Sequence, residues 1–219
     1  MDPHIETRFK NIDASKTFKN IVMQLALNKR AVLDIGCSYG EFLIHFGTGS
    51  TGVTIAKEEV AYGKEKGLDI RYGNIEDGDF LVKEKYDAVF ANNLFEHLYS
   101  PHGFLYKVRD YLKPQGILIL GVPCIPKIVS LLKIRKFRGS LAVAHINFFT
   151  RDTLIKTVER AGYRVQTARG FRFRNKILDH LLDPIYPHFY VVAQLDTSFG
   201  YSEKRMKELA GYTHLSHTT

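Results

Sequence analysis

Short apolar runs alternate with stretches of helical apolar spacing along most of this chain. The runs that predict strands lie at 31–35, 51–55, 68–72, 86–91 and 116–121. The helical patterns lie at 40–46, 57–66 and 101–112, and one over 5–30 predicts one or two helices before the first strand. Because strands separated by helices favour parallel pairing through right-handed crossovers, we predict an α/β sheet covered on both faces.

The alternation breaks after Pro123. An insert of mixed apolar and basic residues occupies 124–149. A helix is predicted over 150–161, with Thr150 as its N-cap and Gly162 as its stop, and strands are predicted at 163–169 and 189–195. We expect these two strands to close the sheet as an antiparallel hairpin with a long connection. Residues 197–219 hold few large apolar side chains and are expected to form a tail.

The composition favours one soluble domain. With 219 residues, 45% of them hydrophobic and 25% charged, the chain has room for a single α/β domain, expected to span 1–196. Residues 1–6 lack the layout of a secretory signal and no apolar run has the length of a bilayer span, so we expect a cytoplasmic protein. Cys37 and Cys124 are the only cysteines, too few for a disulfide framework or a cysteine zinc site.

Positive charge is concentrated in one segment. The formal net charge is +8, yet residues 127–176 hold thirteen basic residues against two acidic ones. An anionic partner at this segment is one interpretation of the pattern, and a solvated basic face is the other.

The run from Val32 to Phe42 carries the most specific chemistry. It reads as a buried strand that ends in an acidic residue and a glycine-spaced turn. Gly36 and Gly40 let a backbone approach a ligand closely, and Asp34 offers a carboxylate to an ammonium or hydroxyl group. The spacing differs from the G-x-G-x-x-G of dinucleotide folds, so it does not favour a pyrophosphate cradle.

This run resembles motif I of the class I S-adenosylmethionine-dependent methyltransferases, and later segments follow in that family's order over about residues 30–195. Residues 92–101 resemble the L-E-H-L…P signature of the branch that modifies quinones, sugars and lipids, and residues 145–150 resemble its H-x-x-F-F-T segment. The resemblance implies a doubly wound, Rossmann-like, mostly parallel sheet of seven strands. It also implies a closing antiparallel hairpin and a lid inserted after the fifth strand.

The resemblance also implies a cofactor, S-adenosylmethionine, and residues that would bind it. Around its methionine end would lie Asp34, Gly36, Ser38 and Gly40, with Cys37 contributing backbone. Thr54 and Ile55 end the second strand on the ribose side, and Asn74 and Ile75 would face the adenine. Asn92, at the end of the fourth strand, would lie near the cofactor's ammonium group.

Thr54 departs from the family's pattern. The family usually has Asp or Glu at this place, which accepts hydrogen bonds from both ribose hydroxyls, whereas a threonine offers one weaker acceptor. A similar threonine occurs in the cyclopropane-synthase-like branch, so cofactor binding stays the expectation. The lost bond costs about 1.5–3 kcal/mol unless Lys57, Glu58 or a bound water compensates.

His97 and His145 are the candidate catalytic residues. A hydroxyl acceptor benefits from a base, and histidine is suited to that role near neutral pH. The structural alternatives are a cap after the fourth strand for His97 and packing beneath the insert for His145. Glu96 and His97 also resemble part of a divalent-metal site of quinone-directed relatives. Asn93 stands where those relatives have a further acidic residue, so we predict no metal.

The composition of the insert indicates what kind of methyl acceptor the protein would bind. By its place after the fifth strand it would hang over the carboxyl ends of the sheet, with apolar residues as a lid and basic residues to meet phosphate or carboxylate. We therefore expect a small-molecule or lipid-linked anionic acceptor, with peripheral membrane contact through the basic insert as an extension. The alternative is a lid whose charges lie simply in water.

Two other functions stay open. A tRNA or rRNA methyltransferase would use the basic segment, but Asn92-Asn93-Leu94-Phe95 replaces the Asn/Asp-Pro-Pro-Tyr/Phe motif of enzymes that methylate base amino groups. Contact with nucleic acid is therefore disfavoured, also because no RNA-binding module is appended. The second alternative is a non-catalytic module for S-adenosylmethionine or S-adenosylhomocysteine, in which Thr54 marks weakened binding.

Overall fold

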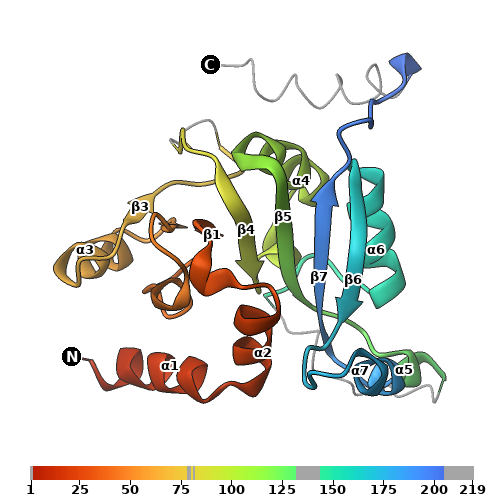
Figure 1. Ribbon diagram of the computed structural model, residues 1–219, viewed down its shortest axis with the longest axis horizontal. Coiled ribbons are helices and arrows are strands. Elements are labelled where there is room, and N and C mark those ends of the chain that lie inside the picture. The colour runs from red at the N-terminus through yellow and green to blue at the C-terminus, as the bar shows by residue number, and fades with distance from the viewer. Residues whose placement is uncertain (1, 78–79, 81, 132–143, 205–219) are drawn as a thin grey trace.

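A sheet of seven strands forms the centre of the computed structural model, which describes residues 2–77, 80, 82–131 and 144–204 (Figure 1). The strands are β1 (Val32–Ile35), β2 (Thr51–Thr54), β3 (Ile70–Tyr72), β4 (Tyr86–Asn92), β5 (Leu112–Pro123), β6 (Tyr163–Arg169) and β7 (His188–Leu195), in the order β3-β2-β1-β4-β5-β7-β6. The first five pair in parallel, and β7 runs antiparallel to both β5 and β6. The predicted doubly wound sheet with its closing antiparallel strands is confirmed.

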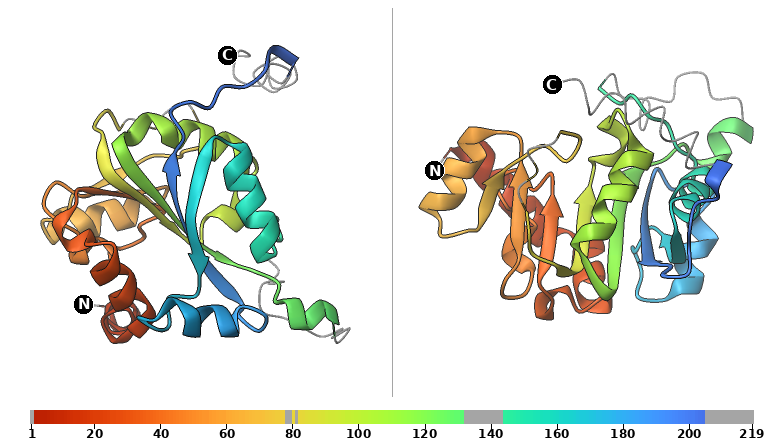
Figure 2. Two further views of the ribbon diagram at one scale, coloured as in Figure 1. Left: turned by 45° about the vertical axis from the view of Figure 1, so that its right-hand side comes forward. Right: turned by 90° about the horizontal axis from the view of Figure 1, so that it is seen from above.

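Helices cover both faces of this sheet (Figure 2). The described helices are α1 (Pro3–Ala14), α2 (Lys16–Gln24), α3 (Lys57–Glu65), α4 (Pro101–Val108), α5 (Lys127–Leu131), α6 (Arg151–Arg160) and α7 (Lys176–Leu182). Alternate residues of β4 enter two separate cores: Val89 packs with α4 and α6, and Phe90 packs with α2. The period of two along a strand thus divides the buried apolar side chains between the two faces.

The carboxyl ends of the parallel strands share one edge of the sheet, the lower edge in Figure 1. Helices α5 and α7 lie at the same edge, because Pro123 at the end of β5 pairs with His188 at the start of β7. Open α/β sheets bind ligands at this edge, beside the point where the strand order reverses between β1 and β4.

Two helices differ from the expectations. The predicted helix over 40–46 is wrong: the structure has one 3₁₀ turn, η2 (Leu43–His45). Gly40 has φ +87° and Gly47 follows the turn, so the stretch between them is too short for a stable helix. Helix α7 was not predicted: the stretch between the last two strands was interpreted as a long connection, although Ile177, Leu178, Leu181 and Leu182 recur at helical spacing.

The insert is described only in part. Helix α5 lies in it, and its residues 132–143, with the expected lid and most of its basic residues, lie outside the described residues. The next helix, α6, is confirmed, and its cap is Thr150, whose side chain accepts a hydrogen bond from the Thr153 amide. Most of the expected tail also lies outside the described residues. No described helix has the length and apolar character needed to cross a bilayer.

Candidate cofactor and acceptor site

The loop after β1 is tied to the end of β2. The Gly36 and Cys37 amides donate hydrogen bonds to the Val53 carbonyl at 2.8 and 3.1 Å. Positive φ values recur along the loop, +80° at Gly36, +50° at Ser38 and +87° at Gly40, so the chain turns sharply there. The predicted turn therefore lies at the carboxyl ends of β1 and β2 together.

The two glycines of this loop have different neighbours. A Cβ at Gly36 would lie 3.4 Å from the Leu94 side chain, which comes from the loop after β4. A Cβ at Gly40 would lie 3.0 Å from Leu68 and 3.1 Å from Ile70, so Gly40 permits close packing beside β3. Gly36 is the glycine that faces the loop after β4.

Cys37 packs inward. A Cβ at Gly52 would lie 2.6 Å from the Cys37 sulfur, so the thiol fills the space over β2. Burial raises the pKa of this thiol far above its ordinary range. Within the loop Cys37 therefore contributes a backbone amide and a buried neutral thiol.

Asp34 presents a buried carboxylate at the end of β1. Its side chain is 1% exposed, and its Oδ2 atom has no hydrogen-bond partner among the described residues. Burial, and then the charge of Glu41, raise its pKa well above the ordinary value. An unpartnered carboxylate oxygen at this depth is costly, and a ligand that donates a hydrogen bond or carries positive charge would offset the cost.

Glu59 places a second carboxylate beside Thr54. Glu59 lies in the first turn of α3, five residues after Thr54. Its Oε1 accepts a hydrogen bond from Ser38 Oγ at 2.9 Å, and its Oε2 accepts one from Thr54 Oγ1. The carboxylate missing from the end of β2 is thus supplied from the next helix. Glu59 was not among the predicted site residues, because its contacts with Ser38 and Thr54 join different elements of the fold.

Arg8 reaches this network from α1. Its Nη2 atom donates to Ser38 Oγ at 2.9 Å, and its Nε atom donates to Glu41 Oε1 at 2.9 Å. The guanidinium thus balances the buried Glu41 carboxylate and ties α1 to the loop after β1. Its distance along the chain from that loop left no signal in the sequence.

Asn74 and Ile75, the two residues expected to face the adenine, have different surroundings. Asn74 is engaged within its own turn, donating to Asp77 Oδ2 at 2.8 Å and accepting from the Glu76 amide at 3.0 Å. Ile75 is 3% exposed and packs in the core. By contrast, Ile55 is 68% exposed and Tyr72 50% exposed, so these two offer apolar surface near the ends of β2 and β3.

Asn92 and Asn93 end β4 beside β5. Asn92 Oδ1 is buried, with no hydrogen-bond partner in the part of the chain that the structure describes. It would lie 2.0 Å from a Cβ at Gly121, so only glycine fits there. Asn93 has φ +52°, and its Oδ1 lies 3.0 Å from His188 Nε2. Burial lowers the pKa of His188 to about 4, so its imidazole is neutral and donates to Asn93. His188 was not among the predicted site residues.

The structure brings both predicted histidines to one buried carboxylate. Nε2 of His97 lies 3.7 Å and Nε2 of His145 lies 3.9 Å from Oε1 of Glu96. The two imidazole rings meet edge to face with centroids 4.9 Å apart. Glu96 is 1% exposed, and neither of its carboxylate oxygens has a hydrogen-bond partner among the described residues. Burial raises the pKa of Glu96, while His97 and His145 act in the opposite direction.

These three side chains can hold a cation between them. Nδ1 of His97 lies 3.0 Å from the Ala144 carbonyl, which accepts, so Nδ1 carries the hydrogen and Nε2 is left as a lone pair toward Glu96. Ligand atoms of Glu96, His97 and His145 all lie within 4.8 Å of one another. A proton shared with an acceptor hydroxyl, or a divalent cation, would satisfy this arrangement. The absence of a metal stays a prediction.

The histidine cluster adjoins the loop after β1. Leu94, whose side chain lies against Gly36, is two residues before Glu96. The Glu96 carbonyl in turn accepts from the amides of Ile146 and Asn147 at 3.1 and 2.9 Å, which holds His145 beside the cluster. The two parts of the site thus come together at the carboxyl edge.

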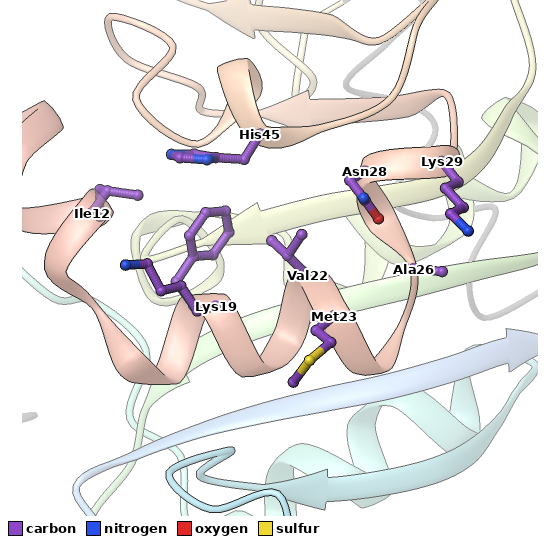
Figure 3. Close-up of a pocket in the computed structure, with 9 residues that line it drawn as sticks. Ile12, Lys19, Val22, Met23, Ala26, Asn28, Lys29 and His45 are labelled. Atoms are coloured by element: carbon purple, nitrogen blue, oxygen red, sulfur yellow. The ribbon is translucent and has the colours of Figure 1, made fainter.

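A separate pocket of about 370 Å³ lies beside α2 (Figure 3). Its lining comes from α1, α2 and the turns around Asn28 and His45, and includes Val22 and Lys19. Asn28 precedes β1, so this pocket reaches toward the amino end of that strand, and it contains no residue of the predicted site.

Known proteins resemble this chain in sequence. A family model described as a methyltransferase domain matches residues 11–168. The chain is 36% identical over 108 residues to the ubiquinone biosynthesis O-methyltransferase of Histophilus somni, covering 43% of this chain and 45% of that protein. It is 27% identical over 106 residues to the (S)-coclaurine N-methyltransferase of Papaver somniferum, covering 43% and 30%. The matched stretch thus spans less than half of each relative's length.

Solved structures resemble it in fold. An S-adenosylmethionine-dependent methyltransferase of Clostridium acetobutylicum superposes with a TM-score of 0.64 at 11% identity, over 88% of this chain and 96% of that one. At so low an identity the likeness concerns the arrangement of helices and strands alone.

Proposed function

Because this chain belongs to the methyltransferase-domain family and has the fold of the class I S-adenosylmethionine-dependent enzymes, we propose that it transfers a methyl group from S-adenosylmethionine to a hydroxyl of a small or lipid-linked metabolite. One observation carries the proposal. Beside the loop after β1, the imidazoles of His97 and His145 lie against the buried carboxylate of Glu96, which has no hydrogen-bond partner among the described residues.

The residues at the ends of β1 and β2 fit the cofactor. When bound, S-adenosylmethionine supplies a methyl group activated by its sulfonium sulfur. The Oδ2 atom of Asp34, buried and without a partner, suits an ammonium group. Glu59 and Thr54 offer hydrogen-bond acceptors suited to ribose hydroxyls, and the exposed Ile55 suits an adenine face.

On the acceptor side, the two histidines take up the proton that the acceptor hydroxyl loses. A hydroxyl that loses its proton during transfer needs a base, and Nε2 of His97 and Nε2 of His145 are the basic atoms of the cluster. The Glu96 carboxylate stabilises the imidazolium that forms, as the buried acid does in other acid–base dyads. Asn147 fixes the geometry by donating to the Leu98 carbonyl at 2.6 Å.

The proposed acceptor class follows from the relatives and from charge. The Histophilus somni relative is named for O-methylation in ubiquinone biosynthesis, and the Papaver somniferum relative for N-methylation of coclaurine. We favour oxygen because an amine that is already unprotonated gains little from a base, whereas a hydroxyl needs one. The basic residues between 127 and 176 favour an acceptor with phosphate or carboxylate.

A transfer assay with methyl-labelled S-adenosylmethionine tests this function. The acceptors are a catechol, a prenylated catechol, a sugar phosphate, a primary amine and tRNA, with products identified by mass spectrometry. We expect label in the O-methyl group of one of the hydroxyl compounds, and loss of that label in His97→Ala combined with His145→Ala. Label only in the amine or in tRNA would contradict the proposal.

A further inference from the structure

Helix α7 exposes an unusual amount of apolar surface. Ile177 is 70% exposed and Leu181 is 69% exposed, and they lie four residues apart on one face of the helix. Ile185, which follows the helix, is 52% exposed. Leu178 and Phe173 flank them at 46% and 40% exposure. Single exposed leucines are ordinary, but five large exposed apolar side chains within thirteen residues form a patch of the kind that marks an interaction surface.

The charges around this patch have one sign. Arg172, Arg174 and Lys176 lie exposed at the start of α7. The two acidic residues of the segment are turned to other partners: Asp179 is fully buried against Arg169 at 2.9 Å, and Asp183 contacts His180 at 3.0 Å and Arg151 at 3.4 Å. The exposed face of α7 is therefore apolar and basic. Such a face is complementary to a membrane surface, where negatively charged headgroups cover an apolar acyl layer.

This face is held firmly on the body of the protein. The Asp179 carboxylate binds Arg169 of β6 and also accepts from the Phe173 amide at 3.0 Å. Asn20 of α2 donates to the Phe171 and Arg172 carbonyls, both at 3.0 Å, and fixes the segment that precedes α7. The apolar side chains thus project from a fixed base rather than from a loose loop.

The face also lies at the edge that carries the site. Figures 1 and 2 show α7 next to α5 at the end of the sheet to which β4 and β6 point. The Ile128 amide of α5 donates to the Pro184 carbonyl after α7 at 3.0 Å, so the two helices are joined. A surface that docked on α7 would meet the same edge as the histidine cluster.

We propose that α7 and the residues on either side of it dock on an anionic membrane leaflet. The docking surface consists of Phe173, Ile177, Leu178, Leu181 and Ile185 with Arg172, Arg174 and Lys176. The helix lies in the interface, its apolar side chains enter the acyl boundary, and the basic residues meet lipid phosphates. A protruding helix face suits a fluid bilayer, whereas a protein partner would need a matching groove. The docking is independent of methyl transfer, and only its use to collect a lipid-linked acceptor rests on the proposed function.

Vesicle co-sedimentation of the full chain tests the proposal. The probes are phosphatidylcholine vesicles with and without phosphatidylglycerol. We expect binding that requires phosphatidylglycerol and weakens with salt. Ile177→Ser with Leu181→Ser should lower the partition coefficient about tenfold or more. Arg174→Glu with Lys176→Glu should lower it about 25-fold or more, at about fivefold per basic residue.

A control variant has one substitution of each kind, an isoleucine to serine and a lysine to glutamate, at exposed positions far from α7 in the sequence. Ile44→Ser with Lys64→Glu alters an exposed isoleucine of η2 and an exposed lysine of α3, and it should bind vesicles like the unaltered protein. Affinity for S-adenosylhomocysteine, measured on every variant, reports that the fold is intact. An unaltered protein that binds vesicles but not S-adenosylhomocysteine would support the docking surface while refuting the proposed function.

Three results would overturn the docking proposal. The first is no vesicle binding by the unaltered protein, and the second is equal binding with and without phosphatidylglycerol. The third is a concentration-dependent dimer in sedimentation velocity that Ile177→Ser with Leu181→Ser abolishes, since a second copy of the chain would then be the occupant of this face.

Discussion

The cofactor half and the acceptor half of the carboxyl edge are built in different ways. In the cofactor half, after β1 and β2, the polar side chains pair with one another: Arg8 with Glu41 and Ser38, and Glu59 with Ser38 and Thr54. In the acceptor half, after β4, both carboxylate oxygens of Glu96 are buried without a hydrogen-bond partner among the described residues. In the cofactor half the paired side chains surround one carboxyl group, that of Asp34, whose Oδ2 has no hydrogen-bond partner among the described residues. In the acceptor half the carboxylate of Glu96 lies between two imidazoles, those of His97 and His145.

This difference separates binding from turnover. A network that is already paired needs little rearrangement to receive a ligand, which favours affinity. A buried carboxylate between two imidazoles, as at Glu96, is typical of groups that act on a substrate. Substitutions in the two halves should therefore separate cofactor affinity from kcat.

The largest effect is expected at Gly36. Gly36→Val puts a β-branched residue at φ +80° and a side chain against Leu94, so binding of S-adenosylhomocysteine should become unmeasurable by calorimetry. The control is Gly67→Val, which bears the same kind of strain at φ +70° with no atom within 4 Å of its Cβ. Retained affinity in Gly36→Val would show that the site is misplaced.

The next effect concerns the acceptor half alone. His97→Ala and His145→Ala should each lower kcat, and together by about 100-fold to 10,000-fold, because the proton of the acceptor loses its base. Affinity for S-adenosylhomocysteine should not change. His180→Ala, an exposed histidine of α7, is the control for loss of an imidazole elsewhere. Full activity in the double variant would exclude both histidines as the base.

A smaller effect tests the relocated carboxylate. Glu59→Gln should weaken S-adenosylhomocysteine binding about tenfold to a hundredfold, which corresponds to about 1.5–3 kcal/mol for a charge-assisted hydrogen bond. Thr54→Asp introduced into that variant should restore much of the affinity by returning the acid to the end of β2. Glu58→Gln alters the exposed neighbour on α3 and should change nothing. Equal affinity in Glu59→Gln and the unaltered protein would refute this role.

The smallest effect is on stability. Burial raises the pKa of Asp34 above its ordinary value of 3.8, so the native state holds a proton that the unfolded chain releases. The stability from this group is complete below that value and is lost as the pH rises through the raised pKa. Asp34→Asn cannot ionise, so without ligand it should gain about 1–3 kcal/mol over the unaltered protein at alkaline pH.

Thermal unfolding from pH 4 to pH 9 checks this prediction. The Tm of the unaltered protein should fall relative to that of Asp34→Asn as the pH rises, by about 2–4 °C for each kcal/mol. The exposed Asp110→Asn is the control, and its Tm should follow the unaltered protein at every pH. Parallel curves for Asp34→Asn and the unaltered protein would contradict the pKa assigned to Asp34.

The same contrast explains how much the sequence could predict. The loop after β1 is a local motif, and its turn between Asp34 and Gly40 is where the spacing put it. Glu59 and Arg8 were missed because their role depends on side-chain direction across elements, which no spacing encodes. His97 and His145 were identified by a resemblance, but that they meet at Glu96 follows only from the hydrogen bonds between Glu96 and the Asn147 segment. Helix α7 was missed because its seven residues are few for a helical pattern, and the stretch was interpreted as a connection between two strands.

Calorimetric titration of S-adenosylhomocysteine into the unaltered protein at neutral pH would show whether the loop joining β1 to η2 holds the adenosyl cofactor. We expect saturable binding at one site per chain, absent in Gly36→Val and weakened in Glu59→Gln. No heat at millimolar ligand, or equal affinity in all three proteins, would contradict it.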